Sequence, residues 1–296
     1  MMLLTPDAWQ SYELLDFGDF EKLERFGEYV LIRPEPQAVV SKHLKASEWQ
    51  KRSSVAFLPK SANSGEWVRS TGSKMPDRWQ ITYQSQKLSL KFRLALTGFK
   101  HIGIFPEQAA NWEFIASCCG KLKKPKVLNL FAYTGGATLA AAYAGAEVTH
   151  VDSVKQVVTW ANDNRELNRL GEVRWMVEDA LRFAQREVRR GNVYQGIILD
   201  PPAYGIGASG ERWKLEEKIN ELVEVLSQLL DPQQGFLVFN AYSMGFSPLI
   251  LETLLSTHFR KLTPKQLEFG ELYFSDLARR RLPMGVFARF SFFNPA

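Results

Sequence analysis

Hydrophobic positions in the C-terminal two thirds of the chain follow two alternating patterns. Short continuous apolar runs are separated by longer segments in which apolar residues recur every three or four positions. The first pattern is typical of buried parallel strands, and the second is typical of amphipathic helices. The predicted strands are 126–131, 147–151, 173–178, 195–200 and 235–240. The predicted helices are 136–144, 154–168, 180–190, 213–230 and 247–258. This alternation predicts a doubly wound α/β sheet.

Two more apolar segments follow the last predicted helix. Residues 265–274 and 285–293 are both predicted to be strands, and no helical pattern separates them. Added to the five strands above, they predict a sheet of seven strands. A dehydrogenase sheet is not expected to end in two strands without a helix between them.

The N-terminal region has a different pattern. Between residues 12 and 100, short alternating runs such as Tyr29–Ile32 and Lys87–Leu94 are separated by prolines and glycines. This pattern predicts a small antiparallel β subdomain. We therefore expect an N-terminal β-rich subdomain over residues 1–105 and a second domain over residues 106–296. The subdomain contains four tryptophans interleaved with lysines and arginines, which either stack on bases or fill a thin β core.

Composition and charge agree with two folded domains. The 296 residues are 45% hydrophobic and 23% charged, which provides ample core material. The net charge of +5 permits a polyanionic partner but is also compatible with ordinary solubility. Two basic runs, Lys121–Lys126 and Arg279–Arg281, are either phosphate contacts or solvated loops.

Metal, disulfide and membrane sites are not expected. The two cysteines are adjacent at 118 and 119, the four histidines are scattered, and no ligand spacing is present. The first residues lack the pattern of a signal peptide, and no apolar run approaches 18 residues. We therefore expect a cytoplasmic protein without a metal.

A glycine turn follows the first predicted sheet strand. The apolar run Val127–Leu130 is followed by Gly135 and Gly136, and Asp152 ends the next strand. Glycines let the backbone approach a ligand closely, and an acidic residue about 20 positions later can accept both hydroxyls of a ribose. The third glycine of the dinucleotide pattern G-x-G-x-x-G is missing, because Leu139 stands there. Adenosine with a small tail is therefore favoured over a pyrophosphate ligand.

Further carboxylates follow the third and fourth strands. Asp179 and Asp200 come after apolar runs, as Asp152 does, and Asp200 is followed by Pro201 and Pro202. Ligands in open parallel sheets bind beyond the carboxyl ends of the strands, so these carboxylates are expected along one rim. Asp179 has an alternative role as the cap of the helix that starts at Ala180. The set suits a ligand with a ribose, an adenine amine and a sulfonium cation.

Six segments in this order resemble the class I S-adenosylmethionine-dependent methyltransferases. They are similar, more narrowly, to the 23S ribosomal RNA large-subunit methyltransferase group, which includes cytosine-5 enzymes, and the likeness covers about residues 99–292. The segments are Asn129–Gly136, Val151–Ser153, Trp160–Ala161, Glu166–Asn168, Asp179–Ala180 and Asp200–Pro202. The resemblance implies a Rossmann-like methyltransferase sheet whose seventh strand lies antiparallel beside the fifth.

The resemblance also implies S-adenosylmethionine as the cofactor. Asp152 would hold the ribose, Asp179 and Ala180 the adenine edge, and the turn at 133–136 the amino-acid tail. The implied cofactor-binding residues are Phe131, Tyr133, Thr134, Gly135, Gly136, Asp152, Ser153, Asp179, Ala180 and Asp200. A segment similar to Gly103–Gln108 closes over the methionine end in the family, where Asp-Gln-Arg is common. Here Ala109 replaces the arginine.

The residues that follow the fourth and fifth predicted strands indicate chemistry without a catalytic cysteine. Methylation of cytosine C5 needs a thiolate, but Ala203 follows the prolines and the segment 239–244 after the fifth strand has no cysteine. Cys118 and Cys119 are expected in the core. The motif Asp-Pro-Pro with a nearby aromatic resembles the site with which amino-methyltransferases hold a planar nitrogen. The candidate catalytic residues are Asp200, Pro201, Pro202, Tyr204 and Asn240, the last reading a base edge or serving as a turn or cap residue.

Three functions remain open from the sequence. The preferred one is a methyltransferase for an RNA base nitrogen in ribosomal RNA, since the β subdomain and the positive charge favour RNA. The alternatives are a methyltransferase for a small molecule or a protein side chain, and a binding protein that has lost turnover. Retention of every cofactor motif argues against the last. RNA is the expected partner, and we expect the β subdomain and the run Lys121–Lys126 to hold it. No membrane partner is expected, and a homodimer is left open.

Overall fold

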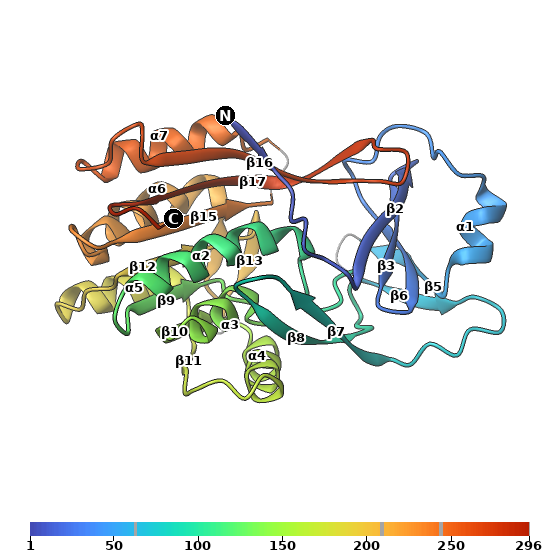
Figure 1. Ribbon diagram of the computed structural model, residues 1–296, viewed down its shortest axis with the longest axis horizontal. Coiled ribbons are helices and arrows are strands. Elements are labelled where there is room, and N and C mark those ends of the chain that lie inside the picture. The colour runs from blue at the N-terminus through green and yellow to red at the C-terminus, as the bar shows by residue number, and fades with distance from the viewer. Residues whose placement is uncertain (62–63, 208–209, 243–244, 296) are drawn as a thin grey trace. The chain divides into compact units, whose positions relative to one another are not determined.

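The computed structural model describes residues 1–61, 64–207, 210–242 and 245–295, and its chain divides into two compact units (Figure 1). The sheet unit comprises Met1–Leu4, Gln108–Leu272 and Met284–Ala296, and the N-terminal unit comprises Thr5–Glu107 and Tyr273–Pro283. The sequence predicted a single division after residue 105, but two segments belong to the other unit than this division gives. The first residues join the sheet unit, and the connection between the last two strands joins the N-terminal unit.

The sheet unit is built on a sheet of eight strands in the order β1-β16-β17-β15-β12-β9-β10-β11. Its parallel centre consists of β9 (Lys126–Leu130), β10 (Glu147–Asp152), β11 (Arg174–Val177), β12 (Gly196–Leu199) and β15 (Phe236–Ala241). These are the five strands predicted from the apolar runs. β17 (Arg281–Ser291) pairs antiparallel with β15, which confirms the arrangement implied by the resemblance.

The eighth strand was not predicted. β1 (Met2–Leu4) pairs in parallel with β16 (Leu267–Ser275) at the edge of the sheet. It has only three residues, and its first two side chains are exposed, so it carries no hydrophobic periodicity. The prediction of seven strands was therefore one strand short.

Helices cover both faces of this sheet, as the predicted doubly wound fold requires. α2 (Ala109–Lys121) and α3 (Gly136–Tyr143) pack on one face through a cluster that includes Ile115, Ala141 and Ile198. α5 (Ala180–Arg189), α6 (Leu215–Leu229) and α7 (Pro248–His258) pack on the other, where Leu199 and Leu222 are buried. α4 (Lys155–Leu167) lies against β10 and β11. Cys118 and Cys119 are fully buried on α2, which confirms their expected place in the core.

One predicted helix starts later than expected. Residues 213–230 were predicted to be helical, but Arg212–Lys214 forms the short strand β14, which pairs with β13 (Tyr204–Ile206). Arg212–Lys214 is extended and not helical because it pairs with β13. This hairpin matters for the site, because it carries Trp213.

The N-terminal unit contains two small sheets. The first consists of β2 (Tyr12–Gly18), β3 (Glu21–Phe26), β4 (Tyr29–Pro34), β5 (Val55–Ser61) and β6 (Ser64–Arg69), and the second of β7 (Arg78–Gln84) and β8 (Ser89–Ala95). The predicted antiparallel arrangement is wrong at one pair, since β4 and β5 are parallel. Parallel neighbours need a crossover connection, and here that connection contains the short helix α1 (Ala46–Arg52).

Two of the four tryptophans of the N-terminal unit are buried, and the other two are half-buried. Trp49 and Trp79 are buried, and the indole of Trp49 donates to the buried Asp16 carboxylate at 2.7 Å. The indoles of Trp9 and Trp67 donate to the backbone carbonyls of Pro106 and Thr97. This packing favours the core-filling alternative over stacking on bases. Arg280 of the basic run is also engaged, since it pairs with Asp16 and Asp276.

Candidate functional site

A pocket in the sheet unit lies at the carboxyl ends of the parallel strands. Phe131 follows β9, Asp152 ends β10, and Pro202 lies after β12. The full lining consists of Phe131, Val151, Asp152, Ser153, Glu178, Asp179, Ala180, Pro202, Gly205, Ile206, Gly207 and Trp213. The fold therefore brings six predicted site residues together: Phe131, Asp152, Ser153, Asp179, Ala180 and Pro202.

The turn between β9 and α3 is tightly packed. Gly135 has a φ of 91°, and a Cβ on Gly136 would lie 2.6 Å from the Trp112 ring, so a larger residue at 136 would force this contact apart. Phe131 and Tyr133 also have positive φ values, of 54° and 49°. Non-glycine residues in this region carry local strain, which is common at ligand-binding sites.

Asp152 holds the backbone that surrounds the pocket. Its carboxylate accepts hydrogen bonds from the backbone N–H groups of Tyr133 and Val154, both at 2.9 Å. Burial nevertheless raises the pKa of Asp152 above its usual value, against the effect of these bonds. These bonds engage both carboxylate oxygens. Each oxygen has a second lone pair, however, so ribose hydroxyls can still donate to it.

Asp179 is the N-cap of α5. Its Oδ1 accepts from the backbone N–H of Arg182 at 2.9 Å, so the capping alternative is realised. The residue also lines the pocket together with Ala180. Since the cap engages one carboxylate oxygen, the other can accept from an adenine amine.

Asp200 differs from the other two carboxylates. Within the part of the chain that the structure describes, its carboxylate has no hydrogen-bond or ion-pair partner. Burial raises its pKa to about 7. A lone carboxylate at the end of β12 is therefore close to half-ionised at neutral pH, as a general base requires.

The residues after Asp200 are held by Trp213. The indole Nε1 of Trp213 donates to the carbonyl of Pro202 at 2.7 Å. The Trp213 ring also contacts Phe131, with centroids 4.7 Å apart. Sequence reasoning missed Trp213, because the residue was placed inside a helix. The only signal was a tryptophan shortly after the Asp-Pro-Pro motif.

The remaining predicted catalytic residues lie in different environments. Tyr204 lies on β13 with 51% of its surface exposed and does not line the pocket. Asn240 is buried within β15, and its Oδ1 accepts from Nδ2 of Asn111 on α2 at 2.8 Å. It is therefore not a turn or cap residue. Ser243 and Met244, from the segment in which a cysteine was sought, lie outside the described residues.

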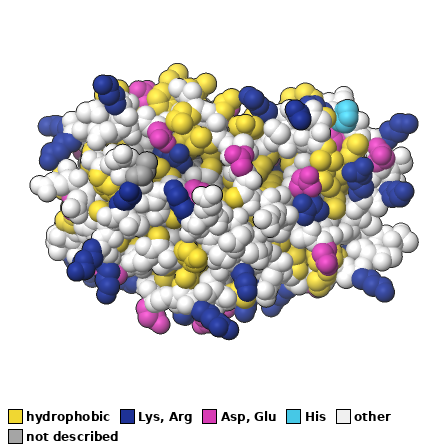
Figure 2. All heavy atoms as spheres, in the orientation of Figure 1, with side chains coloured by type: hydrophobic (Ala, Val, Ile, Leu, Met, Phe, Trp, Pro, Cys, Tyr) yellow, Lys and Arg dark blue, Asp and Glu magenta, His cyan; other side chains and the backbone are white. Residues whose placement is uncertain are grey.

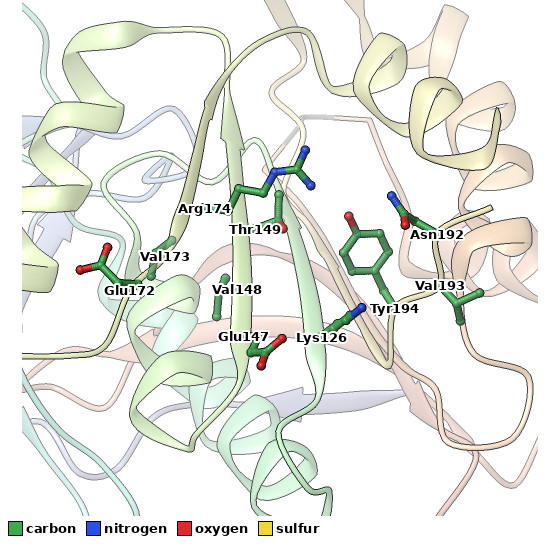
Figure 3. Close-up of a pocket in the computed structure, with 10 residues that line it drawn as sticks. All are labelled: Lys126, Glu147, Val148, Thr149, Glu172, Val173, Arg174, Asn192, Val193 and Tyr194. Atoms are coloured by element: carbon green, nitrogen blue, oxygen red, sulfur yellow. The ribbon is translucent and has the colours of Figure 1, made fainter. Parts of the chain in front are cut away.

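A second hollow lies at the opposite edge of the same sheet, where the strands begin (Figure 3). Its lining consists of Lys126, Glu147, Val148, Thr149, Glu172, Val173, Arg174, Asn192, Val193 and Tyr194. Lys126 is the last residue of the basic run 121–126 and the first of β9. The run thus lies far along the sheet from the cofactor pocket, which favours the solvated-loop alternative.

The cysteines cannot act as nucleophiles where they lie. Burial raises the pKa of Cys119 to about 12 and the pKa of Cys118 well above its usual range. Among the described residues, no group of three or more His, Cys, Asp or Glu side chains is arranged to hold a metal ion. No helix in the described ranges is long and apolar enough to cross a membrane.

Comparisons with known proteins agree with the pocket. A family model described as S-adenosylmethionine-dependent methyltransferase matches residues 19–268. The crystal structure of a SAM-dependent methyltransferase from Agrobacterium tumefaciens is 32% identical with a TM-score of 0.88, covering 99% of this chain and 94% of that one. The structure of SMU.776 with SAH is 17% identical with a TM-score of 0.72, covering 96% and 76%, and shows the same fold.

Two curated relatives are named ribosomal RNA large subunit methyltransferase K/L. The protein from Shewanella frigidimarina is 30% identical over 168 residues, which are 55% of this chain and 23% of that protein. The protein from Shewanella baltica strain OS155 is 28% identical over 264 residues, covering 84% and 36%. The chain thus spans about a third or less of these relatives. From the family match and the pocket, the chain belongs to the S-adenosylmethionine-dependent methyltransferase family and is an enzyme that uses S-adenosylmethionine.

Proposed function

We propose that the enzyme methylates a base nitrogen of ribosomal RNA in the cytoplasm without a catalytic cysteine. The observation that carries the proposal is Asp200, a lone carboxylate with a pKa of about 7 beside the cofactor pocket. The names of the curated relatives support ribosomal RNA as the substrate. The buried thiols of Cys118 and Cys119 support a mechanism without a covalent step.

The residues of the pocket fit the cofactor. Asp152 would accept from the ribose hydroxyls, and Asp179 with the backbone N–H of Ala180 would bind the adenine edge, since all three residues line the pocket. Phe131 and Trp213 provide apolar surface for the adenine ring. The strained turn at residues 133–136 would meet the amino-acid tail with its backbone, because the missing side chains of Gly135 and Gly136 make room for Ala161 and Trp112. When bound, the cofactor supplies a methyl group activated by the sulfonium charge.

Asp200 acts on the nucleophile. Its carboxylate accepts the N–H of the target nitrogen, which orients the nitrogen lone pair toward the methyl carbon. The carboxylate would stabilise the positive charge that develops on the attacking nitrogen and would receive its proton. The buried Pro201 fixes the direction of Asp200, and Pro202 is held by Trp213. The exposed Tyr204 is available to stack on the base, and Asn240 reads its edge.

Docking of the RNA is assigned to the N-terminal unit. A hollow within this unit is lined by Lys42, Lys51 and Arg69 together with the polar side chains of Gln50 and Ser70. Lysine and arginine near polar groups bind phosphates. Figure 2 shows Lys and Arg side chains scattered over the visible face and not gathered in one patch. The distribution of positive charge therefore does not by itself identify the surface that docks the RNA.

The proposal is tested by mapping the methylated nucleotides of ribosomal RNA. Mass spectrometry would compare RNA from a strain lacking the gene with RNA from its parent. We expect one base methylation to disappear and to return when purified enzyme and S-adenosylmethionine are added to the unmodified RNA. Unchanged RNA in the deletion strain, with methyl transfer to a small molecule or a protein side chain, would overturn it. A homodimer stays a hypothesis that sedimentation of the purified protein would test.

A further inference from the structure

Three amide side chains and one arginine of the sheet unit form a hydrogen-bonded relay at the end of β15. Arg289 donates from Nη1 to Oδ1 of Asn111 at 3.1 Å. Nδ2 of Asn111 donates to Oδ1 of Asn240 at 2.8 Å and to Oε1 of Gln108 at 3.2 Å. Asn111 and Asn240 are both buried. The relay thus connects β17, the start of α2 and β15.

The hydrogen bonds of the relay can run in only one direction, from donor to acceptor, starting at Arg289. A guanidinium can donate but not accept, so Asn111 must present its oxygen to Arg289. Its NH₂ group then faces Asn240, which must in turn present its own oxygen to Asn111. The NH₂ group of Asn240 is therefore directed away from the relay. Arg289 itself is fixed by Glu268 at 2.7 Å and by the Ala110 carbonyl at 3.1 Å.

The free end of the relay lies next to Asp200. In the parallel pairing of β12 and β15, Leu199 is opposite Phe239, so the following residues, Asp200 and Asn240, occupy neighbouring positions. Within the described ranges, neither the Asp200 carboxylate nor the Asn240 NH₂ group has a hydrogen-bond partner. One open acceptor and one open donor thus occur at adjacent strand ends, at the edge where ligands bind.

We infer that Asn240 determines substrate specificity as an obligate hydrogen-bond donor, held in that orientation by Asn111 and Arg289. This inference rests on the proposed function. While Asp200 accepts the N–H of the methylated nitrogen, Asn240 donates to the acceptor atom beside it. Nucleobase edges offer this pair, since an amine or ring N–H lies next to a ring nitrogen or carbonyl. Asn240 touches the base, and Asn111 and Arg289 are positioning residues.

The test replaces the donor with a carboxylate of the same shape. Asn240→Asp should lower the rate of transfer from labelled S-adenosylmethionine to unmodified ribosomal RNA transcript at least about 10-fold at pH 8. A protonated Asp can donate, so the ratio of the variant rate to the wild-type rate should rise as the pH falls toward 5.5.

Asn111→Asp tests the relay. The introduced carboxylate keeps its partner Arg289, which holds it ionised, but it cannot donate to Asn240. We expect a fall in rate of about 10-fold, unchanged affinity for S-adenosylmethionine and no recovery at low pH. Asn162→Asp on α4 is the matched control and should keep the wild-type rate. Thermal unfolding at each pH identifies any variant that fails to fold.

The outcomes separate this inference from the proposed function. A wild-type enzyme that transfers no methyl group to RNA would overturn both. If the wild type is active and Asn240→Asp matches it, or if their rate ratio does not change with pH, only the donor role of Asn240 is wrong. An Asn111→Asp variant with the wild-type rate would remove the relay from the mechanism.

Discussion

Two carboxylates at opposite edges of the parallel sheet are in opposite situations: Glu187 on α5 is buried, and Asp200 after β12 is half-buried. At the edge where the strands begin, Glu187 accepts from the Tyr194 hydroxyl at 2.7 Å and from the Asn192 amide at 2.6 Å. Tyr194 and Asn192 line the hollow shown in Figure 3. Arg190 donates to it as well, at 3.1 Å. At the edge where the strands end, Asp200 has no partner within the described residues.

The pKa values of the two groups follow from these surroundings. Burial raises both, but around Glu187 the hydrogen bonds and the charge of Arg174 outweigh it and hold the pKa below its usual value. Nothing offsets burial at Asp200, whose pKa reaches about 7. A carboxylate with all its partners present stabilises the fold, whereas a carboxylate without them can take up a proton from a substrate.

The largest expected effect is on the transfer rate of the Asp200→Asn variant. The amide cannot receive the proton of the nucleophile, so we expect the rate to fall by about 10²-fold or more. Affinity for RNA should stay nearly unchanged. Glu187→Gln is the matched control at the other edge and should keep its rate. If single-turnover assays gave equal rates for Asp200→Asn and the wild type, Asp200 would not receive the proton of the nucleophile.

The next effect concerns cofactor binding. Asp152→Ala should weaken binding of S-adenosylmethionine by roughly 1–3 kcal/mol, because hydrogen bonds to a charged acceptor are lost. Glu147→Ala, at the other end of the same strand, should bind as the wild type does. Isothermal calorimetry measures both. If the two variants lost the same affinity, Asp152 would have no special place in the site.

At pH 8, replacing Asp200 and replacing Glu187 with their amides should change the free energy of unfolding in opposite directions. Because the folded-state pKa of Asp200 is raised, its ionisation destabilises the fold as the pH rises toward 7 and above. Asp200→Asn should therefore be more stable than the wild type by about 1–3 kcal/mol at pH 8 and nearly equal to it at pH 4.

The pKa of Glu187 is lowered, so its contribution to stability is present at neutral pH and lost as the pH falls below its usual pKa. Glu187→Gln should lower stability at pH 8 by about 1–3 kcal/mol. Urea unfolding at both pH values checks the pair of variants. Shifts of the same sign at pH 8 would contradict the assignment of the two carboxylates.

A smaller effect is expected for the basic run near the hollow of Figure 3. Lys123, Lys124 and Lys126 are exposed at the edge opposite to the cofactor pocket. Replacing all three with glutamine should leave the salt dependence of RNA binding unchanged. If they did bind phosphate, the slope would fall by up to roughly 0.9 log unit per duplex contact, or 0.7 for single strands. Filter-binding measurements at several salt concentrations would distinguish an unchanged slope from a reduced one.

No effect on the rate is expected from the cysteines. A Cys118→Ser, Cys119→Ser double variant that still folds should transfer methyl groups as fast as the wild type, because both thiols are buried on α2 away from the pocket lining. An RNA that contains 5-fluorocytosine should form no covalent complex with the enzyme. A trapped adduct would show that an enzyme thiolate takes part.

The sequence by itself determined the sheet and the carboxylates at its rim. Apolar runs located the five central strands, and in a parallel sheet all carboxyl ends meet at one edge. Asp152, Asp179 and Asp200 could therefore be placed on that edge from their positions after the runs. The glycine turn and the missing catalytic cysteine were equally readable, because they depend on residue type and local order alone.

Only the tertiary structure decided what each of these groups contacts. The backbone partners of Asp152, the cap made by Asp179 and the bond from Trp213 to Pro202 set which carboxylates and carbonyls stay open. The relay from Arg289 through Asn111 to Asn240 joins three elements that are far apart in the chain. Periodicity shows which face of an element is buried, but hydrogen-bond partners and pKa values depend on how distant elements pack against one another.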